Sequence, residues 1–180
     1  MRPDRTRACG AGRTLVAAAV VVVGMATSSL AQTPAQPLIR VRGADPIVTG
    51  MIAEAAQSSP TFRRLVAAID QTDGLVYAIR GRCRDGIRAC LPHALTIAGT
   101  NRLLTVVIDH RLLGIEAEAI LGHELQHALE ILSDPTVTTG AAIYRFYDGH
   151  ATRLGNRFET AAAVEAGVAV RVELTRRGRP

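Results

Sequence analysis

The sequence IEAEAILGHELQHALEIL, residues 115–132, is rich in alanine, leucine and glutamate and contains no proline. These residue types favour an α-helix. The apolar residues recur at helical spacing and predict one buried face, which consists of Leu121, Leu125, Ala128, Leu129 and Leu132. Pro135 follows the run and ends it, because proline disfavours the helical conformation in the residue before it. We therefore predict a helix over residues 115–132.

Two histidines and a glutamate lie in this predicted helix as the motif His123-Glu124-Leu125-Gln126-His127. Residues i and i+4 of an α-helix lie above one another on the same face, so both imidazoles can bind one metal ion. Imidazole is a common ligand of Zn²⁺, and Glu124 lies beside the first histidine, where its carboxylate can act as a general base. The structural alternative is a buried helix whose histidines form only hydrogen bonds.

The motif resembles the zinc-binding helix of the zincin metallopeptidases, a family that is divided by its third metal ligand. Metzincins carry a further histidine at a fixed distance after the motif, but here Glu130 follows His127 at the position of their glycine and no such histidine exists. Gluzincins take a glutamate from a second helix downstream. The resemblance therefore implies a gluzincin-like zinc peptidase.

The third ligand is expected within residues 153–174, which are helical in composition at least through Val164. Glu159 is the preferred candidate, because it lies 32 residues after His127 and begins a run of small residues that lets two helices approach closely. Glu165 on the same predicted helix and His150 are the alternatives.

In thermolysin-like gluzincins, an aspartate four residues after the glutamate orients the first histidine by a hydrogen bond. Ala163 occupies that position here. Another group must then hold the imidazole, either a backbone carbonyl or one of three acids: Glu130, Glu165 and Asp148.

The first 31 residues have the pattern of a signal peptide. An arginine-rich start precedes about twelve apolar residues over 15–26, and small residues at 29 and 31 precede Gln32. A membrane span needs about 20 apolar residues, so no stable span is expected after cleavage. We predict a signal peptide over 1–31, a linker over 32–45 and one domain over 46–180, exported to a periplasm or secreted.

The charge of the chain does not indicate a nucleic-acid partner. All 21 basic residues are arginines, and removing the predicted signal peptide lowers the formal net charge from +5 to +2. With three tyrosines, three phenylalanines and no tryptophan, the chain lacks interleaved basic and aromatic residues. A peptide or protein substrate is the expected partner.

Cys83 and Cys90 remain after the predicted cleavage, with the turn signal Asp85-Gly86 between them. In an exported protein this spacing predicts a disulfide across a small loop. The alternative is that Cys90 is a metal ligand, as in the peptide deformylases, which share the histidine motif. Their cysteine motif is absent here, and an exported chain would not meet their substrate at the ribosome.

The other segments predict an α+β domain, a minimal zincin-like fold with a small sheet packed on the metal-binding helix. Helices are expected over 46–57 and 60–71, and strands over 74–80, 95–98 and 103–109, with the last two paired across residues 99–102. In zincins, the edge strand of such a sheet binds an extended peptide by strand addition.

An oxyanion donor is sought in residues 138–150, which connect the motif helix to the last predicted helix. The candidates are Tyr144, Tyr147 and His150, although packing is the alternative role for the tyrosines. His93 and His110 are expected to be structural.

These observations predict an exported zinc-dependent peptidase. His123, His127 and Glu159 would hold one Zn²⁺, and peptide bonds would be hydrolysed by a metal-activated water with Glu124 as general base. Two alternatives stay open: a zinc-stabilised binding module or inactive peptidase relative, and a metal-free exported interaction domain.

Overall fold

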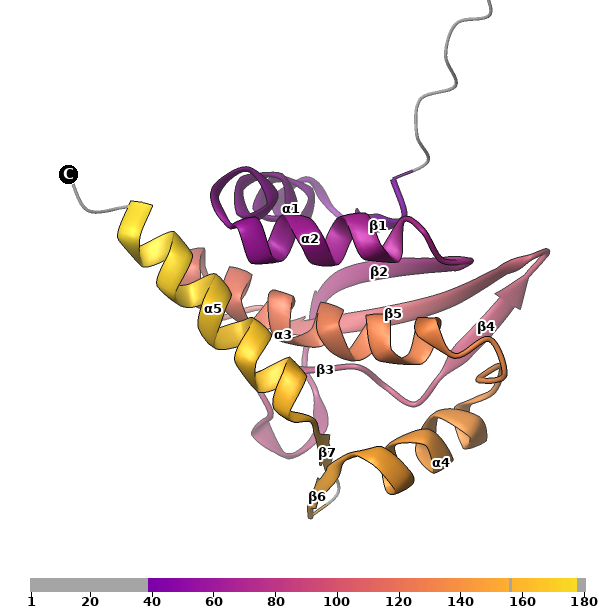
Figure 1. Ribbon diagram of the computed structural model, residues 1–180. Coiled ribbons are helices and arrows are strands. Elements are labelled where there is room, and N and C mark those ends of the chain that lie inside the picture. The colour runs from indigo at the N-terminus through magenta and orange to yellow at the C-terminus, as the bar shows by residue number, and fades with distance from the viewer. Residues whose placement is uncertain (1–38, 156, 178–180) are drawn as a thin grey trace, which may run out of the picture. The chain divides into compact units, whose positions relative to one another are not determined.

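A computed structural model of the protein describes residues 39–155 and 157–177 and confirms the predicted α+β fold (Figure 1). The predicted signal peptide lies outside these residues. None of the helices in the described part combines the length and the apolar character needed to traverse a bilayer.

Two long parallel strands form the centre of the sheet, β2 (Gly74–Gly81) and β5 (Asn101–Asp109). On the far side of β2, the short strand β1 (Val41–Gly43) adds a further parallel pairing. On the other edge of β5, the strands β4 (Leu95–Ala98) and β3 (Ala89–Cys90) pair with it antiparallel, at its beginning and its end respectively. The strands predicted over 74–80, 95–98 and 103–109 are therefore confirmed.

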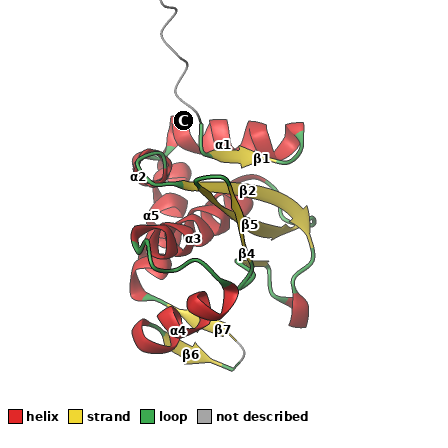
Figure 2. Ribbon diagram, turned by 90° about the vertical axis from the view of Figure 1, so that its right-hand side faces the viewer, coloured by secondary structure: helices red, strands yellow, loops and turns green. Residues whose placement is uncertain are grey.

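The predicted pairing of β4 with β5 is observed, but β5 begins at Asn101, so the turn is shorter than the predicted residues 99–102. Leu95 lies opposite Leu104, and the chain reverses at Gly99, whose φ of 61° lies in the left-handed region that glycine adopts readily. Along β5, alternate side chains from Leu104 through Ile108 are buried. One face of the sheet therefore packs on the helices, and Figure 2 shows α2, α3 and α5 on that side.

Strand β1 corrects the predicted linker over residues 32–45. Val41 is buried and pairs with Val76, and the backbone N–H of Arg40 donates a hydrogen bond of 2.9 Å to Asp70. Three residues are too few for an alternating pattern to reveal a strand. The folded domain therefore begins before residue 46.

The two predicted N-terminal helices, α1 (Pro46–Ser58) and α2 (Pro60–Ile69), begin with the same local signal. In each, a capping side chain precedes a proline at the first helical position. Asp45 accepts a hydrogen bond of 2.9 Å from the backbone of Val48, and Ser59 accepts one of 3.0 Å from the backbone of Phe62. Both helices end within two residues of the prediction.

The motif helix α3 (Gly114–Ser133) is buried on several sides, and α5 (Ala161–Arg177) crosses it closely (Figure 1). A Cβ atom added to Gly122 would lie 2.8 Å from a methyl group of Val170, and one added to Gly167 would lie 3.1 Å from the Cβ of His123. Glycines thus allow the two helices to approach, and α5 lies directly against the first histidine of the motif.

Residues 152–159 form a hairpin, which corrects the prediction that the last helix already includes them. β6 (Thr152–Leu154) pairs antiparallel with β7 (Arg157–Glu159). Gly155 has a φ of 63°, a left-handed conformation that interrupts a right-handed helix and turns the chain. Glu159 therefore lies at the end of a strand, and α5 begins only after Thr160, whose hydroxyl accepts a hydrogen bond from the backbone of Ala163.

The connection between α3 and this hairpin contains a further helix, α4 (Gly140–His150), for which no helix was predicted. Thr139 caps it by accepting a hydrogen bond of 3.1 Å from the backbone of Ala142. Helix α4 brings Tyr147 underneath the motif helix, so it contributes to the surroundings of the histidines.

Candidate metal centre

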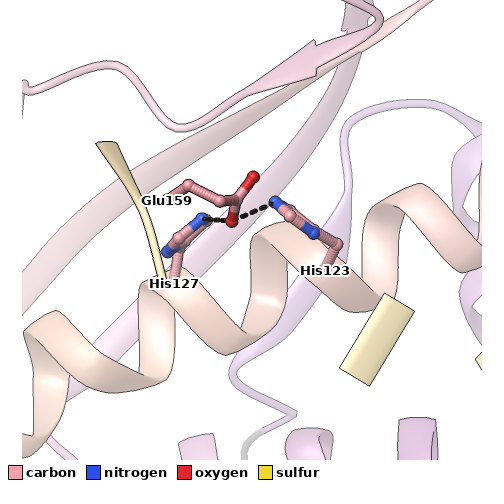
Figure 3. A group of neighbouring side chains, drawn as sticks. All are labelled: His123, His127 and Glu159. Atoms are coloured by element: carbon pink, nitrogen blue, oxygen red, sulfur yellow. Dashed lines mark ion pairs between the residues drawn. The ribbon is translucent and has the colours of Figure 1, made fainter. Parts of the chain in front are cut away.

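Three side chains from two elements converge on one point (Figure 3). His123 and His127 extend from adjacent turns of α3, and Glu159 reaches toward them from the end of β7. Oε1 of Glu159 lies 3.4 Å from Nε2 of each histidine, and the donor atoms of all three residues lie within 4.8 Å of one another. Among the described residues, the alternatives Glu165 and His150 do not belong to this group.

Two of the three separations between these atoms match a tetrahedral metal ion. Two donor atoms bound to Zn²⁺ at about 2.0–2.1 Å in a tetrahedron lie about 3.3–3.4 Å apart. Both observed carboxylate–imidazole separations are 3.4 Å, which is long for a hydrogen bond. Two imidazoles and one carboxylate are also a known ligand set of catalytic zinc.

An unpartnered oxygen supports the same interpretation. Oε1 of Glu159 is buried and accepts no hydrogen bond from any side chain or backbone group in the described part of the chain. A buried carboxylate oxygen without a partner is unfavourable. A cation bound between the three side chains would remove that cost, so the residues present fit a metal ion.

Glu130 orients the second histidine. Its Oε2 lies 3.2 Å from Nδ1 of His127, and its Oε1 accepts a hydrogen bond of 2.8 Å from the hydroxyl of Thr160. This contact directs Nε2 of His127 toward Glu159, as a carboxylate behind a metal-binding histidine commonly does. Because Thr160 follows Glu159 directly, Glu130 also connects α3 to the segment that carries the third candidate ligand. The sequence had suggested Glu130 for the first histidine instead.

Burial is the largest influence on the first histidine and lowers the pKa of His123. The Glu159 carboxylate opposes this effect, and the backbone of Ala163, the residue at the aspartate position of thermolysin-like gluzincins, opposes it to a smaller extent. For His127, burial also acts to lower the pKa, but the hydrogen bond to Glu130 and the surrounding carboxylates outweigh it and raise the pKa. Burial thus favours the neutral form of the His123 imidazole, which is the form that binds a metal ion.

Glu124 is buried beside the histidines, with only 6% of its surface exposed. Burial raises the pKa of Glu124 to about 7, which the charge of His127 and a backbone hydrogen bond from Leu91 partly oppose. A carboxyl group that titrates near neutrality can both accept and return a proton. Its place on α3 therefore suits a general base.

A cleft of about 830 Å³ opens onto these residues. Helix α3 contributes His123, Glu124 and His127 to its lining. The opposite walls come from residues 82–93, which lie around β3, and from the β6–β7 hairpin. The candidate ligands therefore adjoin a cleft with room for part of a peptide.

Of the three predicted oxyanion donors, only Tyr147 lines the cleft. It is 3% exposed, and its hydroxyl donates a hydrogen bond of 2.9 Å to the backbone carbonyl of His127. Tyr147 therefore supports the motif helix. Tyr144 does not line the cleft, and the guanidinium group of Arg153 lies over its ring. His150 is exposed, and its Nδ1 lies 2.7 Å from the backbone carbonyl of Phe146.

His93, which was expected to be structural, lines the cleft. Its ring centroid lies 5.7 Å from that of Phe158 and 6.1 Å from that of Tyr147, and burial lowers its pKa. No local pattern marks this residue, because it occupies the connection between β3 and β4 and approaches the site only through tertiary packing. His110 lies elsewhere, with Nδ1 3.7 Å from Asp109.

The sulfurs of Cys83 and Cys90 lie 2.05 Å apart, at disulfide distance, with their Cα atoms 6.1 Å apart. The pair closes the loop that contains the short 3₁₀-helix η1 (Arg84–Gly86). Both cysteines line the cleft, but Cys90 does not belong to the group of three candidate ligands. The pair therefore fastens one wall of the cleft.

The site thus combines a three-residue ligand set, a buried carboxylate and an open cleft. No protein-family model, curated protein or solved structure compared with this chain matches it, so its function has to be inferred from these residues.

Proposed function

We propose that this protein is a zinc-dependent peptidase of the gluzincin-like type. The observation that carries the proposal is the buried, unpartnered Oε1 of Glu159, 3.4 Å from Nε2 of both His123 and His127. Glu124 follows the first histidine on α3 and faces the same cleft. If the predicted signal peptide directs export, the substrate is met outside the cytoplasm.

In this proposal, His123, His127 and Glu159 hold Zn²⁺, and their number favours catalysis over a purely structural role. Structural zinc sites are usually closed by four protein ligands, whereas catalytic sites have three and keep one position open. The candidate ligands here are three, and a cleft adjoins them. A bound Zn²⁺ lowers the pKa of water toward neutrality and polarises a carbonyl oxygen.

Glu124 supplies the proton transfers. Its carboxylate accepts a proton from the attacking water, whose oxygen forms a bond to the peptide carbonyl carbon. The C–N bond then breaks, Glu124 passes the proton to the leaving amine, and the products are a carboxylic acid and an amine, which ionise to a carboxylate and an ammonium group. Glu130 and Thr160 keep His127 and the segment of Glu159 in place during these steps.

The test of this function is the substitution Glu124→Gln, which preserves size and polarity but removes the proton acceptor. Turnover of fluorogenic peptides by the zinc-loaded protein should fall by about 10²- to 10⁴-fold, the usual contribution of a positioned general base. Zinc content and melting temperature should stay close to those of the wild type. Glu165→Gln, the same change at an exposed position of α5, is the matched control and should retain activity.

Two outcomes would contradict the proposal in different ways. Equal turnover by wild type and Glu124→Gln would remove Glu124 from the mechanism. A wild-type protein that binds one zinc ion but hydrolyses no member of a broad peptide library would favour the zinc-stabilised binding module.

A further inference from the structure

We infer that the cleft selects peptides with acidic side chains next to the bond that is cleaved, and that three arginines provide this selectivity. These residues are Arg82, Arg84 and Arg157, all of which line the cleft together with the candidate metal ligands. The location of the acidic residues next to a cleaved bond rests on the proposed function. The preference for acidic peptides can be measured by binding alone.

The arginines lie on two different walls. Arg157 and Glu159 are two residues apart on β7, and alternate residues of a strand project to the same face. Arg157 therefore extends on the side of the candidate ligand Glu159. Arg82 and Arg84 flank Cys83, which the disulfide fixes to Cys90, so both are held on the loop that forms another wall. A peptide in the cleft would meet positive charges from both walls.

None of these three arginines has an acidic partner among the described side chains. Elsewhere, Arg88 pairs with Glu116, Arg102 with Asp73, and Arg111 with Asp109, at distances of 2.6–2.8 Å. Among the side chains that the structure describes, the acids that line the cleft are Glu124, which is buried, and Glu159, which belongs to the candidate metal site. The guanidinium groups of the cleft are thus free of described ion pairs.

The charge balance of the cleft favours an anionic peptide. With a divalent ion bound, the lining side chains that the structure describes would place three arginines and the ion against two carboxylates, a formal balance of +3. A cleft lined by charge of one sign attracts ligands of the opposite sign. Guanidinium groups bind carboxylates by two parallel hydrogen bonds, so glutamate or aspartate side chains are suitable partners. Apolar residues between the arginines, such as Leu91 and Phe158, fit the rest of a peptide.

The experiment uses three fluorescent peptides that differ only in the residues flanking one central bond, which are glutamates, glutamines or lysines. Their dissociation constants are measured by fluorescence anisotropy with the zinc-loaded Glu124→Gln protein, and their cleavage is measured with wild type. The glutamate peptide should bind about 10-fold or more tightly than the glutamine peptide, and the lysine peptide most weakly. Exposed charges are screened by salt, so 0.5 M NaCl should reduce the difference.

Arginine substitutions assign the effect to the cleft. Arg82→Gln, Arg84→Gln and Arg157→Gln should each lower the glutamate-over-glutamine preference by about 2- to 5-fold, the scale of an exposed ion pair. The triple variant should lose it. Arg176→Gln makes the same charge change near the far end of α5 and should have no effect. All four positions are exposed, and melting curves verify that each variant is folded.

Equal affinity for the three peptides, or a preference that survives the triple substitution, would overturn the inference. Equal affinity for a single-stranded oligonucleotide of the same charge would also overturn it, because the cleft would then recognise negative charge alone. Tight binding of the glutamate peptide without cleavage by wild type would refute the proposed function and leave the inference standing. Cleavage of the peptides without a preference for the acidic one would overturn the inference and leave the proposed function standing.

Discussion

Two buried polar clusters contact helix α3, and they differ in whether their hydrogen bonds are complete. At the end of the helix, Arg102 is only 3% exposed and donates to the carboxylate of Asp73. It also donates to four backbone carbonyls, those of Ile131, Leu132, Asp134 and Val137. In the metal-site cluster, by contrast, a buried oxygen of Glu159 has no partner among the described residues.

Buried polar groups therefore have two different roles in this protein. The last carbonyl groups of a helix have no partners within it, and a cation placed there both satisfies them and interacts favourably with the helix dipole. The Arg102 cluster is therefore complete within the protein and stabilises the fold. The cluster around Glu159 is incomplete within the chain, which is expected where a ligand completes it. Substitutions in the two clusters should accordingly have different consequences.

The largest expected effect is the loss of zinc binding on replacing a histidine. His123→Ala and His127→Ala each remove one of three candidate ligands, and neither variant should retain zinc after purification. Excess zinc at about 1,000 times the dissociation constant stabilises the wild type by about 4 kcal/mol through linkage, but it should not raise the melting temperature of either variant. Metal analysis and thermal melts check this. Near-stoichiometric zinc in either variant would make the ligand assignment wrong.

Replacing Arg102 should have a large effect on the stability of the fold and none on zinc affinity. Arg102→Met removes a donor from four carbonyls, of which those of Ile131 and Asp134 keep a backbone donor, and should lower the free energy of unfolding by about 3–5 kcal/mol, measured by urea denaturation. Protein that remains folded should bind zinc with unchanged affinity. Arg88→Met, which breaks an exposed pair with Glu116, should cost less than about 1 kcal/mol. Loss of zinc affinity in folded Arg102→Met would show that the clusters are coupled.

Glu159→Ala should have an intermediate effect. Removal of this carboxylate should weaken zinc binding by about 10- to 100-fold or more, judged from the effects of removing even outer partners of metal ligands. Because Oε1 of Glu159 has no described hydrogen bond to lose, stability without zinc should not fall. Glu165→Ala is the control, and competition with a zinc chelator gives both affinities. If Glu165→Ala weakens zinc binding and Glu159→Ala does not, the third ligand is Glu165 and the assignment of Glu159 is wrong.

The smallest effect is expected at Glu173, whose carboxylate accepts hydrogen bonds from the protein and can be titrated. Burial acts to raise the pKa of Glu173, but hydrogen bonds from Ser59 and Thr61 outweigh it and lower the pKa. A carboxylate with a lowered pKa stabilises the fold above its unfolded pKa, and this contribution is lost as the pH falls through the folded value. Glu173→Gln should therefore cost about 1–2 kcal/mol at pH 7, and the cost should decrease as the pH falls below the ordinary pKa of glutamate. Unfolding free energies across this range test the prediction, which a pH-independent difference would contradict.

Elements with a strong local pattern were predictable from the sequence. The motif helix and the strands β2 and β5 have clear periodicity, and proline after a capping residue marks α1 and α2. Strand β1 was missed because three residues carry no period, and α4 because its buried positions are few. The pairing of β6 with β7 was missed because a single glycine, Gly155, is a weak signal for a turn.

The candidate site was predictable as far as spacing along a helix determines it. The i, i+4 relation brings the imidazoles of His123 and His127 together in any helix, and the distance along the chain allowed Glu159 to return to them. The contacts of Glu130 with His127 and Thr160 depend on how β7 meets α3. The same applies to the hydroxyl of Tyr147 and to His93, since tertiary packing alone places them beside the motif helix.

The loop closed by Cys83 and Cys90 has a consequence for protein engineering. It forms a wall of the cleft, yet it contributes none of the three candidate ligand atoms and is fastened at both ends independently of them. Residues 84–88 can therefore be randomised as a library while the histidines, Glu124 and Glu159 are kept. Under the proposed function, such a library would change which peptides are accepted and leave the hydrolytic groups in place.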